Sequence, residues 1–262
     1  MRISLLIFTG IIFISGNSPK EKLKEAPPGT TWLKDNLFID QAPIRNIDYL
    51  EYEYVMRRCK FSIECWKAYG DSLIKFNSNY TKAIKSLVDN CKPNSDSLSI
   101  MIFKYSHLIW GRHFWGVDEY LNNPKYQNYP CININYETAI AYCEFRTQAV
   151  LMDYGINKKS KHYSQVKYRL PTQEEWEYAL LKYKNLIPSP SHKIDSSCVV
   201  RQCFTNKNKL YQLSNISEMV FEKGFAKGIS WKDSTINDIN YTTNYTDYAD
   251  WLGFRCICEV SE

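Results

Sequence analysis

The chain has 262 residues, of which aromatic residues make up 15% and charged residues 23%. No low-complexity tract follows the N-terminal residues, so the composition excludes a disordered protein and indicates a single globular domain. The formal net charge is +5, and the lysines are scattered among acidic residues. Without a basic stripe, we expect no nucleic-acid partner.

The N-terminus has the features of a secretory signal peptide. A positive charge at Arg2 precedes an apolar run from Ile3 to Ile14, and small residues follow it. The run is too short to span a bilayer, which takes roughly 20 apolar residues, so we expect residues 1–16 to be removed. The exported chain would then have no membrane span. We also expect no lipid anchor, because the first cysteine, Cys59, lies far from the cleavage point.

The next segments predict the beginning of the domain, which we expect to span residues 28–262 after a flexible segment at 17–27. Thr30 to Asp40 alternates apolar and polar residues, as in a half-buried strand. Asn46 can cap the helix that follows. We interpret residues 58–117 as a helical insertion.

Gly111 to Pro130 is rich in aromatic residues, Asn and Pro, and this composition predicts a long structured connection.

Two helices are predicted in the second half of the chain. Asn135 can cap one helix, and Thr172 with Glu175 forms a capping box before a helix over Gln173 to Tyr183. From Pro188 onward only short strands and loops are expected, with glycines between them. Few helices, short strands and many loops indicate an irregular α+β domain.

Nine cysteines are typical of a protein in an oxidising compartment, and the odd number leaves at least one thiol unpaired in a monomer. No Cys-x-x-Cys occurs, and the four histidines lie far from any metal-like cysteine spacing, so we expect no zinc site. Spacing does not fix the connectivity. Cys198 with Cys203 is one candidate pair, and Cys59 or Cys65 with Cys91 is another.

Several motifs resemble those of one known family. Tyr168 to Ala179 (YRLPTQEEWEYA) resembles the most recognisable segment of the formylglycine-generating, or sulfatase-modifying factor, family. Other segments similar to family motifs flank it in the family's order: Pro28–Trp32, Phe38–Asp40, Asn135–Cys143, Leu210–Glu218, Lys227–Trp231 and Gly253–Cys256. The resemblance implies the irregular, loop-rich fold of the formylglycine-generating enzymes, a relative of the C-type lectins, with few helices and short antiparallel strands.

A narrower resemblance involves two further stretches. Tyr120–Pro130 and Glu218–Gly228 look like members from Bacteroidetes-type bacteria, including gliding-motility and type IX secretion lipoproteins. Those relatives are generally regarded as structural components rather than oxidases. The resemblance therefore implies a structural role in the envelope, although this chain lacks their lipidation cysteine.

The family's enzymes oxidise a substrate cysteine with oxygen, and two cysteines after a Gly-Gly-Ser-aromatic motif hold copper(I). Thiolates suit that site because they are soft ligands. The matching stretch here, Gly228 to Asp238, contains no cysteine. Asp233, Ser234 and Asp238 cannot replace thiolates at a cuprous site. We therefore expect no formylglycine-generating activity and assign no catalytic residue.

A second branch of the superfamily makes sulfoxides with a histidine-bound iron supplied by an additional helical domain. Between Cys59 and Trp115 the chain offers only His107 and His113. Six residues apart, they would fall on different faces of a helix, so we interpret them as core or surface histidines.

The resemblance also implies calcium ligands in the segment that ends at Glu218. Gln212 stands where Asn or Asp is usual, Glu218 is kept, and the loop is one residue short before Asn215. Two interpretations stay open. Gln212 and Glu218 belong to a degraded calcium site, or Glu218 pairs with a nearby cation or caps backbone donors.

A disulfide between Cys143 and Cys256 is a further implication of the resemblance. It would close a loop of more than a hundred residues, for which chain entropy gives roughly 4 to 5 kcal/mol as an upper figure. The alternative is that Cys143 is only a small buried hydrophobe.

Aromatic residues are expected in two settings. Trp176, Tyr178, Trp231 and Phe254 lie inside family motifs, and we expect them to fill the core. Asn240 to Tyr248 is rich in Tyr, Asn and Thr, which predicts a solvent-facing recognition loop. In some relatives the corresponding loop carries diversified ligand binding. Drift in an AT-rich genome would produce the same composition.

Two functions follow from these observations. The first is a non-catalytic binding or scaffold module of the envelope, whose partner is an envelope protein or a surface ligand bound through Asn240 to Tyr248. The second is an enzyme of the same superfamily with altered chemistry, because fold does not fix function. A convergent cluster of titratable or thiol groups in one pocket would favour the second.

Overall fold

The computed structural model describes residues 24–60, 117–156, 161–183 and 216–262, except 234, 235 and 237. The predicted signal peptide and most of the predicted insertion lie outside these residues. Part of the segment expected to be flexible is included, and there the N–H of Glu25 donates a hydrogen bond to the carbonyl of Lys161.

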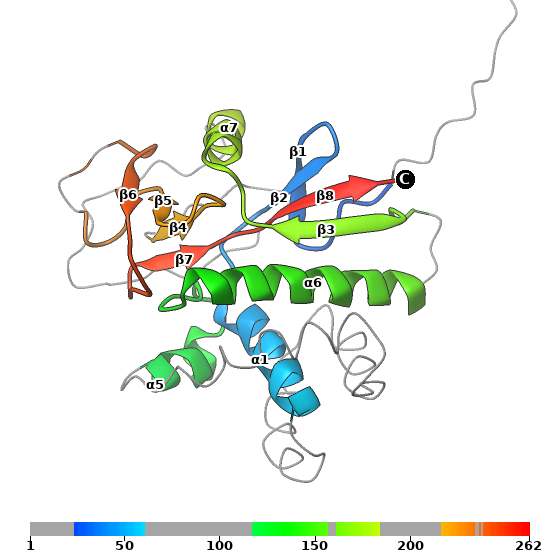
Figure 1. Cartoon of the computed structure of the whole chain (residues 1–262), viewed down its shortest axis with the longest axis horizontal. Coiled ribbons are helices and arrows are strands. Elements are labelled where there is room, and N and C mark those ends of the chain that lie inside the picture. The colour runs from blue at the N-terminus through cyan, green and yellow to red at the C-terminus, as the bar shows by residue number, and fades with distance from the viewer. Residues whose placement is uncertain (1–23, 61–116, 157–160, 184–215, 234–235, 237) are drawn as a thin grey trace, which may run out of the picture.

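Four α-helices and two four-stranded sheets form the described fold (Figure 1). The helices are α1 (Asn46–Lys60), α5 (Val117–Asn122), α6 (Tyr136–Ile156) and α7 (Gln173–Tyr183). The predicted α+β class is therefore confirmed. Within the segment predicted to be a long structured connection, the chain forms α5 and a 3-10 helix at Pro124–Tyr126.

The first sheet has the strand order β1-β2-β8-β3, and all neighbours are antiparallel. Its strands are β1 (Thr30–Lys34), β2 (Leu37–Asp40), β8 (Ile257–Ser261) and β3 (Gln165–Arg169). The single strand predicted over Thr30 to Asp40 is thus a hairpin. The chain reverses at Asp35, whose φ of 44° is the left-handed conformation that tight turns require.

Side chains of the first sheet alternate between two helices, α6 on one face and α7 on the other (Figure 1). Phe38 and Cys258 belong to the main core with α6, whereas their neighbours Ile39 and Ile257 pack with α7. This alternation follows from the two-residue period of a strand. Both faces of the sheet therefore contribute side chains to the core.

The second sheet has the order β6-β5-β4-β7. Its strands are β6 (Thr242–Asn244), β5 (Phe225–Lys227), β4 (Ser217–Met219) and β7 (Leu252–Phe254). β4 and β7 are parallel, which departs from the predicted antiparallel pattern at this one pair. β7 continues through Arg255 and Cys256 into β8, so the C-terminal segment joins the two sheets (Figure 1).

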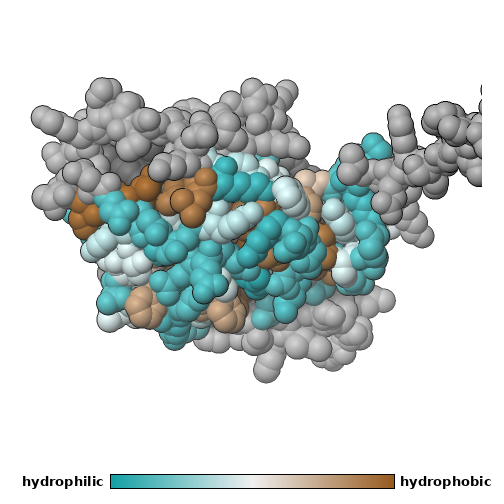
Figure 2. Space-filling model, turned by 90° about the horizontal axis from the view of Figure 1, so that it is seen from above, coloured by the Kyte–Doolittle hydropathy of each residue, from teal (hydrophilic) through white to brown (hydrophobic). Residues whose placement is uncertain are grey.

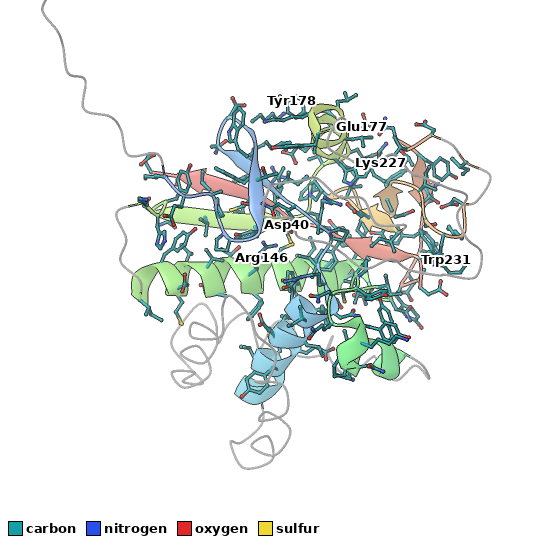
Figure 3. All side chains as sticks on the ribbon, turned by 180° about the vertical axis from the view of Figure 1, so that it is seen from behind. Asp40, Arg146, Glu177, Tyr178, Lys227 and Trp231 are labelled. Carbon is teal, nitrogen blue, oxygen red and sulfur yellow. The ribbon has the colours of Figure 1, made fainter. Side chains whose placement is uncertain are left out.

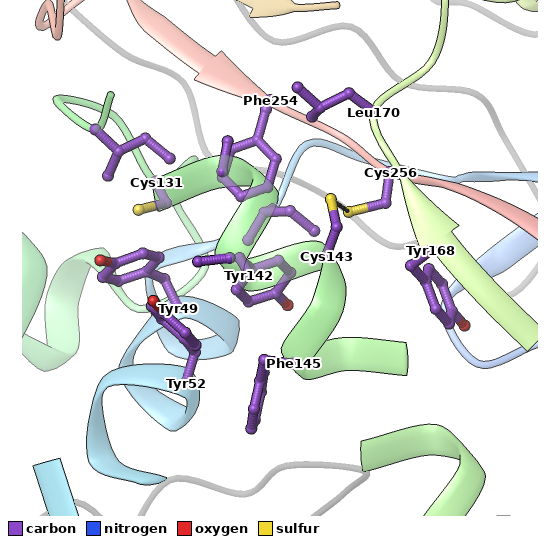
Figure 4. Packing of buried hydrophobic residues seen from close by; sticks show 14 of the residues in the cluster. Tyr49, Tyr52, Cys131, Tyr142, Cys143, Phe145, Tyr168, Leu170, Phe254 and Cys256 are labelled. Carbon is purple, nitrogen blue, oxygen red and sulfur yellow. Dashed lines mark hydrogen bonds between the residues drawn. The ribbon is translucent and has the colours of Figure 1, made fainter. Parts of the chain in front are cut away.

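Aromatic rings fill the core between α1, α6 and β7 (Figure 4). The ring of Tyr52 meets that of Phe145 edge-on at 5.4 Å between centroids, and Tyr142 meets Phe254 in the same way at 5.4 Å. Such pairs contribute about 0.5 to 1.5 kcal/mol each beyond the area they bury.

Local capping signals were correct for two helices and wrong for one. Asn135 Oδ1 accepts the N–H of Thr138 at 2.9 Å, and Thr172 and Glu175 exchange hydrogen bonds at 3.2 and 2.9 Å. Asn46 does not cap α1, because its Oδ1 accepts no hydrogen bond from any described residue, and its amide nitrogen donates to the carbonyl of Tyr126 at 2.9 Å. It joins α1 to the segment before α6.

The surface seen from above is mostly hydrophilic, with hydrophobic residues in small patches (Figure 2). The large hydrophobic side chains exposed among the described residues are Trp32, Ile156, Tyr178, Leu181, Phe221, Phe225 and Tyr248. No helix in the described part of the chain is long and apolar enough to cross a bilayer.

Candidate functional site

The stretch where the resemblance places two copper-binding cysteines contains turns closed by carboxylates. Asp233 Oδ2 accepts hydrogen bonds from both the N–H and the hydroxyl of Ser230, at 3.2 and 2.5 Å. Further along, Asp238 Oδ1 accepts the N–H of Asn240 at 2.9 Å. Ser234 lies outside the described residues. Each aspartate therefore stabilises the local backbone.

This arrangement does not fit a cuprous ion. The sequence from Gly228 to Asp238 supplies oxygen donors and no thiolate, and copper(I) prefers soft sulfur ligands. The carboxylates of Asp233 and Asp238 are also engaged by the backbone of their own turns. No group of three or more His, Cys, Asp or Glu side chains placed to hold a metal occurs among the described residues.

Glu218, the predicted calcium ligand, pairs with the guanidinium group of Arg255. Its Oε1 accepts a hydrogen bond from Nη2 of Arg255 at 2.6 Å, and its Oε2 accepts one from Nε1 of Trp176 at 2.8 Å. The side chains of Glu218 and Arg255 are 1% and 0% exposed. These contacts favour the interpretation in which Glu218 pairs with a cation. Gln212, the other predicted ligand, lies outside the described residues.

Residue 228 has to be a glycine beside this buried cluster, because a side chain there would strain the backbone. Its φ is 90°, a conformation that L side chains rarely adopt. A Cβ atom there would also lie 3.3 Å from the ring of Trp176. The motif that contains Gly228 thus packs the beginning of the Gly228–Asp238 stretch against α7.

The two cysteines predicted to form a disulfide lie in contact. Sγ of Cys143, on α6, is 3.5 Å from Sγ of Cys256, and both residues are buried (Figure 4). A disulfide would require about 2.05 Å, so the contact is that of two thiols and the bond stays a prediction. Burial raises the pKa of the Cys256 thiol well above its usual value.

A buried ion pair holds the backbone beside these cysteines. Asp40 Oδ2 accepts Nη1 of Arg146 at 2.7 Å and the N–H of Cys256 at 2.7 Å. Figure 3 shows Asp40 and Arg146 facing one another between β2 and α6. The carboxylate therefore links α6, β2 and the β7–β8 junction around the thiol pair.

Two other cysteines in the described part of the chain, Cys131 and Cys258, are also buried. The remaining candidate pairings depend on cysteines outside the described residues, as do the two histidines considered as iron ligands: Cys65, Cys91, Cys198, Cys203, His107 and His113.

The expectation that the motif aromatics fill the core is right for Trp176 and Phe254, which are fully buried. It is wrong for Tyr178, which is 42% exposed. α7 packs through Trp176 and Leu180, and Tyr178 lies on the outer side of the same helix. Trp231 is half-buried, and its Nε1 donates to the carbonyl of Asp250 at 3.3 Å.

The predicted recognition loop is only partly solvent-facing. Asn244 and the residues from Thr246 to Tyr248 are exposed, whereas Thr243 and Tyr245 are buried. The loop includes β6, and the N–H of Tyr245 donates to the carbonyl of Gly224 at 3.0 Å. The loop is therefore built onto the second sheet, and its tip, from Asn244 to Tyr248, is exposed at every residue except Tyr245.

Sequence reasoning missed four charged residues that organise these features: Lys227, Asp40, Arg146 and Arg255. Each lies in or beside a quoted motif, and Arg146 follows Cys143 by three residues, which places both on one side of α6. That spacing was an available signal for Arg146. Nothing in the local sequence identifies its partner.

The geometry defines a domain of the formylglycine-generating type without the thiolate site. The chain matches the sulfatase-modifying factor enzyme 1-like domain over residues 5–185, and it belongs to that family. Among curated proteins the comparison found no match to this chain. The second sheet and β8 lie beyond the matched residues, yet β8 occupies the middle of the first sheet.

Proposed function

We propose that this chain is an exported, non-catalytic binding or scaffold protein of the bacterial envelope, which uses the family fold as a rigid platform for its loops. The observation that carries the proposal is the stretch Gly228–Asp238. It has no thiolate, and Asp233 and Asp238 close turns there. The oxidation of a substrate cysteine at copper(I) has no ligand set in this stretch.

The alternative, an enzyme of the same superfamily with altered chemistry, receives less support. Catalytic groups are expected to converge in a cleft with unusual pKa values. Here the buried carboxylates of Glu218 and Asp40 are paired with Arg255 and Arg146. Such pairs have a structural use, since they join separate segments of the core. We propose no metal cofactor, because Glu218 already has a cationic partner.

Placement in the envelope rests on sequence features. The signal-peptide pattern of residues 1–16 and the nine cysteines support export. The likeness of Tyr120–Pro130 and Glu218–Gly228 to gliding-motility and type IX secretion lipoproteins supports a Bacteroidetes-like envelope. We propose a periplasmic, outer-membrane-peripheral or secreted protein that carries no lipid.

The tip of the loop Asn240–Tyr248 is the proposed contact surface for an envelope protein or a surface ligand. A combination of Tyr, Asn and Thr side chains supports this role, because such residues provide adaptable contacts at low entropy cost. Its exposed members are presented by β6 and by the turn after it.

The test is chemical crosslinking in intact cells of the producing bacterium, followed by affinity purification and mass spectrometry. The wild type is compared with an Asn244→Ala/Tyr248→Ala double variant and with Leu181→Ala, a control that removes a side chain 70% exposed on α7. We expect one crosslinked species to disappear in the double variant and to persist in the control. Equal recovery in all three proteins would contradict binding through the loop.

A further inference from the structure

Lys227 is a lysine whose ammonium group is buried and fully hydrogen-bonded. It ends β5, and its side chain is 2% exposed. Nζ donates to Glu177 Oε1 at 2.8 Å, to the carbonyl of Asn240 at 2.7 Å and to Thr242 Oγ1 at 2.8 Å. An ammonium has three donors, so these acceptors use all of them.

The three acceptors belong to two separate parts of the chain. Glu177 lies on α7, whereas Asn240 and Thr242 begin the predicted recognition loop. Figure 3 shows Lys227 and Glu177 close together between β5 and α7. The ammonium therefore joins the first residues of the loop to the helix.

A buried lysine is costly, and an apolar side chain of similar length would fill the same space without that cost. What only the ammonium supplies is a set of directed bonds. These bonds fix where the loop begins relative to α7. Lys227 therefore fixes the position of the loop more than it stabilises the core.

Other contacts hold the rest of the loop. The N–H of Gly228 donates to the carbonyl of Tyr241 at 2.9 Å, and Trp231 Nε1 bonds to the carbonyl of Asp250 just beyond the loop's end. Between these anchors lies the exposed tip from Asn244 to Tyr248. A surface held in one conformation loses less entropy when it binds.

We propose that Lys227 is a positioning residue for the recognition loop. Its ammonium holds Asn240 and Thr242 against Glu177, so that the exposed tip is presented in one conformation. This inference rests on the proposed function, in which the loop is the contact surface.

Hydrogen exchange of the purified full chain tests the inference, with Lys227→Met as the main variant. Methionine has a similar length, and the Glu177 side chain left behind is 40% exposed, so water can solvate it. We expect the amides of residues 241–245 to exchange at least about tenfold faster, because local opening is cheaper without the three bonds. The amides of α6 and β8 should keep wild-type rates.

The matched control is Lys223→Met. Lys223 also pairs with a carboxylate, that of Glu137, but its side chain is 63% exposed. Wild-type exchange in that control, with faster exchange limited to the loop in Lys227→Met, supports the inference. Unchanged exchange in residues 241–245, or an equal rise throughout both sheets, would overturn it.

A second variant and a second measurement complete the test. If Lys227→Met does not fold, Thr242→Val removes a single acceptor, and the same loop-limited rise decides for or against the inference. The crosslinking yield is then compared between Lys227→Met and Lys223→Met, and we expect it to fall only in the first. A loosened loop with an unchanged crosslink would refute the claim that a single conformation of the loop matters for binding, whereas an unloosened loop would refute the positioning role. Binding through the loop is refuted separately, by equal recovery of the Asn244→Ala/Tyr248→Ala variant.

Discussion

Arg255 and Glu218 form an ion pair in the interior of the fold, with Nη2 of Arg255 at 2.6 Å from Oε1 of Glu218. Glu218 lies on β4, and Arg255 directly follows β7, the parallel neighbour of β4. Trp176 of α7 donates to the same carboxylate, and Nη1 of Arg255 donates to the carbonyl of Asp40 at 3.2 Å. The pair therefore connects the second sheet, α7 and the end of β2.

Removing the carboxylate charge should destabilise the protein strongly. Glu218→Gln leaves Arg255 buried without a counter-charge, and we expect the free energy of unfolding to fall by about 3 to 5 kcal/mol. Urea denaturation followed by tryptophan fluorescence measures the change. Glu137→Gln, which removes one partner of an exposed pair, is the control and should unfold close to the wild type.

Calcium distinguishes the two interpretations of Glu218 in the same assay. A carboxylate held by Arg255 and Trp176 should leave the wild-type urea midpoint unchanged whether calcium or EDTA is present. A calcium-dependent rise that Glu218→Gln abolishes would instead identify Glu218 as a ligand.

The predicted disulfide is tested by peptide mapping of the exported protein without reductant. We expect a peptide in which Cys143 is joined to Cys256, because their sulfurs are 3.5 Å apart and the predicted leader would carry the protein into an oxidising compartment. Cys143→Ser should lose stability by up to roughly 4 to 5 kcal/mol, the entropic maximum for a loop of this length. Full alkylation of both cysteines after unfolding, with no reductant added, would refute the pairing.

Acid should weaken the bonds of Glu175 that hold the first turn of α7. Burial raises the pKa of Glu175, but its bonds to Arg169 and to the N–H of Thr172 outweigh burial and place the pKa below the ordinary 4.5. A lowered folded-state pKa stabilises the protein above pH 4.5, and this contribution disappears as the pH falls through the folded value. The stability difference between wild type and Glu175→Gln should therefore be largest at neutral pH. Urea midpoints from pH 7 to pH 3 check this, and a constant difference would contradict it.

The predicted leader fixes where the mature chain should begin. We expect its N-terminus near Asn17, because the apolar run ends at Ile14 and small residues follow. Intact-mass measurement of protein from the envelope fraction, with palmitate labelling alongside, tests this. An intact leader or incorporated palmitate would be contrary to the prediction.

Local signals predicted local structure well. Each capping bond of Asn135, Thr172 and Glu175 joins two residues that are three apart in the sequence. Donor and acceptor can therefore both be identified from a short stretch of sequence. Asn46 has the same residue type as Asn135, yet its amide bonds to carbonyls 74 and 80 residues away. Tertiary contacts decided its role.

Site residues that depend on distant partners could not be predicted in the same way. Lys227 and Glu177 are 50 residues apart in sequence, and Asp40 and Arg146 are 106 apart. Motif membership shows that such a residue belongs to the fold, but it does not name the partner. The exposure of Tyr178 has a similar origin, because the motif predicts the helix and the packing of α7 decides which side faces outward.

The predicted absence of oxidase chemistry can be tested with a peptide substrate. Purified protein is incubated with copper(I), oxygen and a cysteine-bearing sulfatase peptide, next to an active formylglycine-generating enzyme as the positive control. Because Gly228 to Asp238 provides no thiolate, we expect a peptide mass identical to that of the protein-free reaction. Copper-dependent conversion of the peptide cysteine to the aldehyde would contradict it.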